Sequence, residues 1–217
     1  MANFFKNYRD SIIIKDHIKS KYIIAGDYSY YSGYYHGKSF EDCVMYLDRD
    51  DNLKQEHEVD KLIIGKFCSI ATGVKFMMGG TQGHNYQQIA NYPLDFLEEE
   101  FDGYKNIAPK AHKLKGDTII DNDVWLGAES MIMPGVNIAD GAVIGARSLV
   151  TKNIGPYEIW AGNPARFIKK RFSDEDIEKL LQIKWWEWSL DKIKENLDFI
   201  RSKNVSGLWI KLYEKQE

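Results

Sequence analysis

The chain has 217 residues, enough for one sizeable domain with a short appendage; 44% of them are apolar, 28% are charged, and the net charge is −3. Without a basic excess it is not expected to bind nucleic acid, and two cysteines, Cys43 and Cys68, are too few for a disulfide scaffold. No signal-peptide core or membrane-length apolar run is found, so a soluble, cytoplasmic protein without a membrane partner is predicted.

The first unusual segment is YSYYSGYYHG, residues 28–37, which holds five tyrosines, two glycines and a histidine. Its tyrosines show no helical spacing, and each tyrosine ring combines an apolar face with a polar tip. Such a segment suits either a pocket for an aromatic ligand or an interface between subunits, and both alternatives stay open here.

A six-residue period starts at Ile64 and returns more fully from Ile120. Neither an α-helix nor an alternating strand has a period of six, whereas a short strand followed by a corner does. Three such units make one coil of a triangular prism, with its large aliphatic residues inside. A mainly β protein, a parallel β-helix, is predicted in preference to an α/β protein with chance spacing. The inward positions of the second run are Ile120, Leu126, Ile132, Ile138, Ile144 and Val150.

Residues 77–117 interrupt this period and predict an extended loop, a place where function is often found. The predicted organisation is a β-helix domain over residues 1–172, which includes this loop, and a C-terminal helical segment over residues 173–217.

The C-terminal segment contains two helix signals. Ser173 and Asp176 form a capping pattern, and a second helix is expected to start near Ser189. These helices are expected to cover the open end of the prism. The buried stripe predicted for the second helix consists of Leu190, Ile193, Leu197 and Ile200.

Several motifs carry a family resemblance. IIGKFCSIATGV and DTIIDNDVWLGAESMIMPGVNIADGAVIGARSLVTKNI resemble the hexapeptide-repeat acyltransferases, which implies that the β-helix is left-handed. SYYSGYYHGKSFEDC, GTQGHNY, AGNPARFIKKRF and WWEWSLDKI resemble the xenobiotic acetyltransferases, above all the type B chloramphenicol acetyltransferases, over nearly the whole chain. This resemblance implies transfer of an acetyl group from acetyl-CoA to a hydroxyl of chloramphenicol or a related small hydroxylated antibiotic, without a metal. It also implies a homotrimer with acceptor sites between neighbouring prisms.

The resemblance assigns the general base to His84, in the loop excursion. A neutral imidazole can accept the hydroxyl proton near neutral pH, and of the five histidines His36 is kept only as a possible pocket residue. An acyl-cysteine route is disfavoured, because Cys68 falls at an inward offset of the repeat and Cys43 has no histidine near it in sequence.

The resemblance also suggests the ligand contacts. Beside acetyl-CoA it places Ala128, Ala146, Thr151 and Lys152. The cations Arg166, Lys169 and Lys170, followed by Arg171, would offer charge to the CoA phosphates. The expected acceptor contacts are Tyr30, Tyr34, Tyr46 and Trp125, so the tyrosine segment is assigned to both the pocket and the trimer interface.

Three other functions fit parts of the predicted fold. A streptogramin A (virginiamycin-type) acetyltransferase would share GKFCSI and the tryptophan-rich motif, and it is the main alternative. A hydratase of the γ-type carbonic anhydrase kind needs three zinc-binding histidines, and the chain has no H-x4-H pair. A non-catalytic β-helix scaffold would not need His84 or the cationic run.

Overall fold

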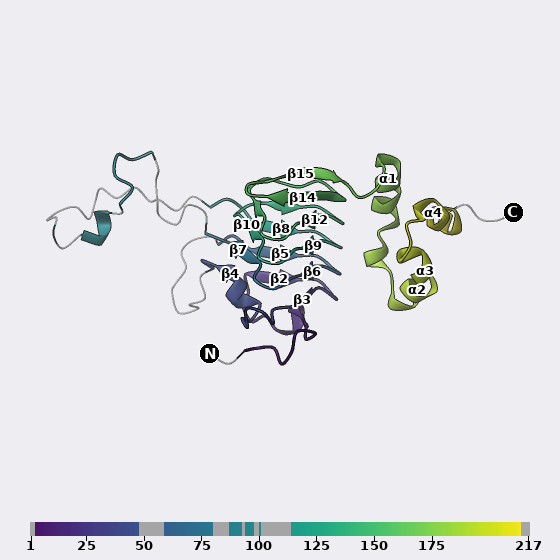
Figure 1. Ribbon diagram of the computed structural model, residues 1–217, viewed down its shortest axis with the longest axis horizontal. Helices are drawn as coiled ribbons and strands as arrows, with labels where there is room; N and C mark the ends of the chain where they lie inside the picture. Colours follow the sequence, from purple (N-terminus) through teal and green to yellow (C-terminus); the bar gives the residue numbers. More distant parts are fainter. Residues whose placement is uncertain are drawn as a thin grey trace.

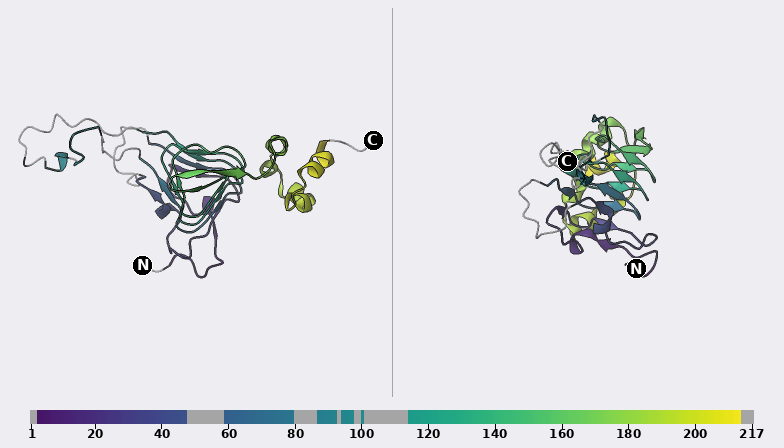
Figure 2. Two further views of the ribbon diagram at one scale, coloured as in Figure 1. Left: turned by 45° about the horizontal axis from the view of Figure 1, so that its top comes forward. Right: turned by 90° about the vertical axis from the view of Figure 1, so that its left-hand side faces the viewer.

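The computed structural model describes residues 3–47, 59–79, 87–92, 94–97, 100 and 114–213. Its centre is a stack of short strands with a group of helices beside it (Figure 1), and Figure 2 shows the coils winding around a common axis. The strands form three sheets, one for each face of the prism, and pairs between successive coils are parallel. The predicted left-handed parallel β-helix is confirmed.

Each sheet collects every third strand of the coil. Sheet A has the order β1 (Ile12–Ile13), β3 (Tyr30–Tyr31), β6 (Ser69–Ile70), β9 (Trp125–Leu126), β12 (Val143–Ile144), β14 (Glu158–Gly162) and β15 (Ala165–Lys170). Sheet B has the order β11 (Asn137–Ile138), β8 (Thr118–Ile120), β5 (Leu62–Ile64) and β2 (Ile23–Ala25). Sheet C has the order β13 (Leu149–Val150), β10 (Met131–Ile132), β7 (Lys75–Met77) and β4 (Val44–Met45).

The core is the column of inward side chains that the period predicts. In sheet A, Leu126 pairs with Ile144, three six-residue units further along the chain, and both side chains are buried. Stacking equivalent aliphatic residues from successive coils removes a continuous apolar column from water, at about 25 cal/mol for each Å². At the first coil, aromatic and aliphatic side chains close the column, namely Phe5, Ile14 and Phe40.

Tight corners join the short strands. At Gly127, a Cβ atom would lie 2.6 Å from the backbone nitrogen of Ala146 on the next coil. A residue with a side chain would therefore push two coils apart, and glycine is required by this close approach. Corners of this kind let two-residue strands follow one another around the prism.

The C-terminal helices are α1 (Asp174–Ile183), α2 (Leu190–Glu195), α3 (Leu197–Ile200) and α4 (Val205–Tyr213), and short 3₁₀ turns occur at Ile14–Asp16, Glu41–Cys43, Leu94–Leu97 and Trp185–Glu187. Ser173 caps α1 by accepting a hydrogen bond from the Asp176 amide, as predicted. Ser189 caps α2 in the same way through the Lys192 amide, so this helix starts where it was predicted to start. In the part of the chain that the structure describes, no helix is long and apolar enough to cross a membrane.

Two predictions about these helices are wrong. The expected second helix is broken at Asn196, whose backbone leaves the helical region at φ −113° and ψ 14°, and Leu190 and Leu197 are consequently exposed. The helices also lie beside the stack rather than over its end (Figure 1). The physical reason is aromatic packing on a corner of the prism, where the Trp185 ring packs against the Phe67 ring at a centroid distance of 4.8 Å, tilted by 50°.

Candidate active site

The excursion that carries the predicted base His84 leaves the stack after β7 and returns at β8. His84 itself lies outside the described residues. At the departure, the Met78 amide donates to the Met45 carbonyl at 3.0 Å. Tyr46, one of the predicted acceptor contacts, directly follows Met45, and its side chain is exposed. The first residues of the excursion are thus hydrogen-bonded to the edge of sheet C, next to the predicted acceptor contact Tyr46.

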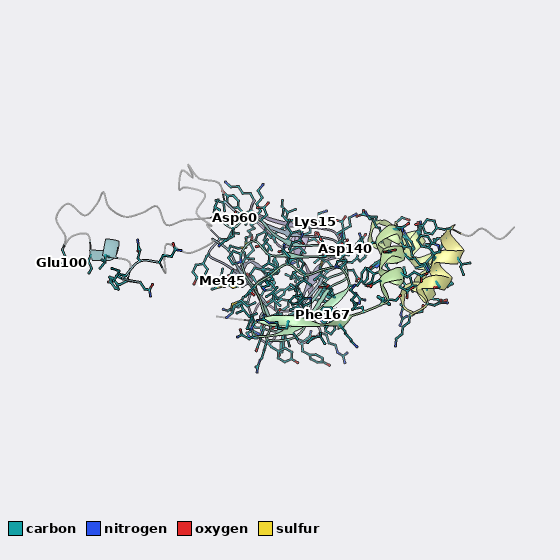
Figure 3. The ribbon with its side chains drawn as sticks, turned by 90° about the horizontal axis from the view of Figure 1, so that it is seen from above. Lys15, Met45, Asp60, Glu100, Asp140 and Phe167 are labelled. Atoms are coloured by element: carbon teal, nitrogen blue, oxygen red, sulfur yellow. The ribbon has the colours of Figure 1, made fainter. Side chains whose placement is uncertain are left out.

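The return of the excursion is fastened by a buried carboxylate. Asp60, only 7% exposed, accepts hydrogen bonds from the amides of Lys115 at 2.9 Å and Gly116 at 3.1 Å. Figure 3 places Asp60 on the side of the stack from which the excursion extends, whereas Asp140 faces the C-terminal helices. Sequence reasoning missed Asp60, although an acidic residue directly before an apolar repeat was a detectable signal.

Two of the predicted acceptor contacts share one surface. Tyr30 and Trp125 both occupy outward positions of sheet A, each paired with Ser69 between them. Their side chains are 39% and 55% exposed, so this face of the prism presents two aromatic rings, separated by the coil that carries Ser69. Such a surface can form a wall for an aromatic ligand or a contact with another subunit.

The other two predicted contacts lie elsewhere in the chain. Tyr34 is half-buried against the core at the first coil, and its ring meets that of Tyr35 edge-on at a centroid distance of 5.5 Å. Tyr46 lies in the turn directly after β4, the edge strand of sheet C, and not on sheet A. A single chain therefore places Tyr30 and Trp125 on one sheet, with Tyr34 and Tyr46 outside the strands of that sheet.

The predicted coenzyme contacts occupy two corners of the β-helix and its last strand. Ala128 and Ala146 stack at the corner between sheets A and C, where the Arg147 amide donates to the Ala128 carbonyl at 2.8 Å. Thr151 and Lys152 follow β13 and are exposed at the next corner. Both side chains at the first corner are single methyl groups, and Ala146 is exposed.

The predicted cations lie on β15, the last strand of sheet A. Arg166, Lys169 and Lys170 are exposed, and Lys170 forms an ion pair with Asp174. Arg171 is committed elsewhere, because its guanidinium donates to the Gly141 carbonyl at 2.6 Å and lies 3.4 Å from the Asp123 carboxylate. Three exposed cations therefore lie on one strand, one of them already in an ion pair, and the fourth ties the strand to the prism.

Both thiols have the environment of core residues. Burial raises the pKa of the Cys68 thiol to about 12, and burial also raises the pKa of Cys43. A thiol that stays protonated is a poor nucleophile, so the acyl-cysteine route has no support at either position. Among the residues with a described position, no group of three histidine, cysteine or acidic side chains could hold a metal ion.

A further group of side chains meets at the corner beside Ala128 and Ala146. The His36 imidazole lies 3.0 Å from the Thr72 hydroxyl through Nδ1 and 3.6 Å from a Glu129 carboxylate oxygen through Nε2. Glu129 also forms an ion pair with Arg147. Sequence reasoning noted His36 and missed its partners, although Glu129 and Arg147 are 18 residues, or three repeat units, apart.

Several known proteins are similar to this chain. Residues 117–152 match the family model described as bacterial transferase hexapeptide (six repeats). The chain is 50% identical to a chloramphenicol acetyltransferase of Klebsiella aerogenes over 96% of both chains. It is 43% identical to a virginiamycin A acetyltransferase of Staphylococcus aureus, over 94% of this chain and 88% of that protein. A solved hexapeptide-repeat acetyltransferase of Vibrio cholerae is 21% identical, with a TM-score of 0.46 over 70% of this chain and 65% of that one.

Proposed function

Because the chain belongs to the family of hexapeptide-repeat chloramphenicol acetyltransferases, we propose that it transfers the acetyl group of acetyl-CoA to a hydroxyl of chloramphenicol and thereby confers resistance. The observation that carries this proposal is the 50% identity to a protein of that name over 96% of both chains. Since acetyl-CoA is a metabolite of the cytoplasm, the proposal also places the enzyme there.

The proposed reaction is a direct acyl transfer. The acceptor oxygen attacks the thioester carbonyl, His84 takes the hydroxyl proton, and the carbon–sulfur bond breaks to release CoA as a thiolate that is then protonated. No acyl-enzyme is formed. This route is supported by the raised pKa values of the two buried thiols, which make both cysteines poor nucleophiles.

The proposed binding surfaces follow the geometry of the prism. Acetyl-CoA would lie along the corner of Ala128 and Ala146 and past Thr151 and Lys152. Its phosphates would be held by the cations of β15, which are Arg166, Lys169 and Lys170. Charge-assisted hydrogen bonds from such side chains are the usual means of holding phosphate.

The proposed acceptor site lies at the seam between two copies of the chain. Tyr30 and Trp125 would line it from sheet A, whereas Tyr34 and Tyr46 lie outside the strands of that sheet. A neighbouring copy of the chain can add its own side chains to this wall. A homotrimer with three equivalent sites therefore fits the placement of these rings.

The decisive experiment is a thiol-release assay with purified protein and acetyl-CoA. Chloramphenicol, virginiamycin M and serine are offered as separate acceptors, with a reaction lacking acceptor as the blank. Release of CoA with chloramphenicol well above the blank is expected. The 43% identical virginiamycin A acetyltransferase makes streptogramin A the second candidate, and a clear preference for virginiamycin M would favour it. No release with any acceptor and no binding of CoA would point to a non-catalytic scaffold.

A further inference from the structure

One corner position of the β-helix recurs in three successive coils. Gly73, Glu129 and Arg147 each follow an inward aliphatic residue by three places, and each has a left-handed backbone with φ of 72°, 59° and 58°. The Glu129 amide donates to the Thr72 carbonyl at 2.9 Å, which stacks the first two corners directly. Side chains at this position therefore form a column along the edge between sheets A and C, with neighbours roughly 4.8 Å apart.

The first member of the column has no side chain, and His36 takes its place. A Cβ atom on Gly73 would lie 2.7 to 3.0 Å from three atoms of the His36 imidazole. The ring thus occupies the space where a corner side chain would otherwise stand. From there Nδ1 reaches the Thr72 hydroxyl and Nε2 faces Glu129, whose other carboxylate oxygen pairs with Arg147.

The contacts of His36 with Thr72 and Glu129 hold the C-terminal end of the tyrosine segment, residues 28–37. Its near end is held in β3, where Tyr30 and Tyr31 pair with Ser69 and Ile70. Between the two ends the chain turns, with the amides of His36 and Gly37 both donating to the Gly33 carbonyl. The ring pair Tyr34–Tyr35 lies inside this turn, so its position depends on both attachments.

The same corner carries the proposed coenzyme contacts. Ala128 precedes Glu129, and Ala146 precedes Arg147. The tyrosine segment, assigned to the acceptor, is thus latched to the edge along which acetyl-CoA is proposed to lie. Glu129 is the shared partner of both sides.

We propose that His36 is a positioning residue for the acceptor site: with Thr72, Gly73 and Glu129 it latches the tyrosine segment onto the coenzyme corner. This proposal rests on the proposed acetyl transfer. His36 does not touch the reacting atoms in this role, so it sets how well the acceptor binds rather than how fast the bound acceptor reacts.

The test compares His36→Ala, His36→Asn and Thr72→Val with the wild-type protein. The Asn variant offers an amide in place of Nδ1 and can keep the bond to Thr72, whereas the Thr72→Val variant removes that bond and keeps the shape. His17→Ala is the matched control, because His17 is an exposed histidine that contacts the Ile13 carbonyl instead of the corner.

The latch predicts a specific split of the kinetic constants. In His36→Ala the KM for chloramphenicol should rise about 5- to 30-fold, as expected for loss of one or two hydrogen bonds. Both kcat and the KM for acetyl-CoA should stay within about threefold. The Asn variant should recover part of the loss, Thr72→Val should show a smaller rise than His36→Ala, and His17→Ala should match the wild type.

Other outcomes would overturn the latch. A fall in kcat at unchanged acceptor KM would place His36 in the chemical step, and an equal rise in both KM values would mean general damage to the corner. Amide hydrogen exchange of residues 30–37 provides a readout that needs no activity, and it should quicken in His36→Ala while other coils keep their protection. If the wild type transfers nothing to chloramphenicol, the proposed function has failed, and unchanged exchange in His36→Ala would separately refute the latch.

Discussion

At the scale of single residues, the two histidines that the structure describes, His17 and His36, have different surroundings. His17 bonds a backbone carbonyl, and His36 fills a gap in the corner column. Neither histidine belongs to the loop excursion, residues 77–117, to which the family resemblance assigns the general base. The proposed mechanism therefore depends on His84, which lies outside the described residues.

Replacing His84 by alanine should lower kcat by about 10²- to 10⁴-fold, the usual contribution of general-base catalysis. Affinity for CoA should hardly change, because this residue serves the acceptor hydroxyl rather than the phosphates. The acid limb of the kcat/KM profile should show one ionisation that disappears in the variant. If His36→Ala abolishes turnover and His84→Ala does not, the base has been assigned to the wrong histidine.

A second residue-scale prediction concerns Asp123. Burial raises the pKa of Asp123 to about 6, although the nearby Arg171 acts in the opposite direction. Because the folded protein holds this proton more tightly than the unfolded chain, Asp123 favours folding most at low pH, and that contribution is lost as pH rises through about 6.

Asp123→Asn should therefore raise the free energy of unfolding by about 1 to 3 kcal/mol at pH 8, with the gain vanishing near pH 4. Asparagine tolerates the left-handed backbone at this position, where φ is 55°. Urea unfolding at several pH values measures the difference. Asp27→Asn is the contrasting control, since the hydrogen bond from Lys15 lowers the pKa of Asp27 and gives the opposite pH dependence. A variant less stable than the wild type at pH 8 would contradict this account.

At the scale of elements, β15 is the strand that combines fold and charge. It pairs antiparallel with β14, unlike the parallel coils before it, and ends the stack on that side. Lys169 stands opposite Ile159, whereas Lys170 is already paired with Asp174. The two lysines should consequently contribute unequally to coenzyme binding.

The double variant Lys169→Ala and Lys170→Ala should weaken CoA binding by about 5- to 100-fold, the range for charge-assisted phosphate contacts. Of the single variants, Lys169→Ala should have the larger effect. Dephospho-CoA, which lacks the 3′-phosphate, should lose less affinity than CoA in isothermal titration. Lys194→Ala, on α2, controls for the change in net charge. Equal losses for both ligands would mean that these lysines do not recognise the 3′-phosphate.

At the scale of the whole molecule, two faces of the prism carry large apolar side chains that a monomer would leave uncovered. Sheet A presents Tyr30 and Trp125 outward, and sheet B presents Ile24, which is 47% exposed. Exposed apolar side chains on neighbouring coils commonly mark a surface that another chain covers. Three copies around one axis would cover such faces and close the proposed acceptor sites.

Sedimentation at micromolar concentration should therefore give three times the chain mass of 25.2 kDa. Trp125→Glu should shift the protein toward smaller species, because a charge at the seam would have to lose its water. Tyr213→Glu, on the exposed end of α4, should leave the mass unchanged and serves as the control. A wild-type mass near that of one chain would reject the trimer.

The sequence alone determined the β-helix and its inner column. Each six-residue unit meets the same local packing problem, so Leu126 and Ile144 reveal their shared position by spacing, without knowledge of the chain path. The caps at Ser173 and Ser189 were predictable for the same reason, since a side chain that caps a helix bonds an amide three residues away.

The tertiary structure decided the contacts between segments that are distant in the sequence. That His36 fills the space above Gly73 and faces Glu129 depends on how a turn of the first coil lies against two later coils. That the helices pack on the corner at Phe67, and not over the end of the prism, depends on Trp185 finding an aromatic partner there. A repeat fixes contacts by its period, whereas these contacts join segments that share no period, so only the folded chain brings them together.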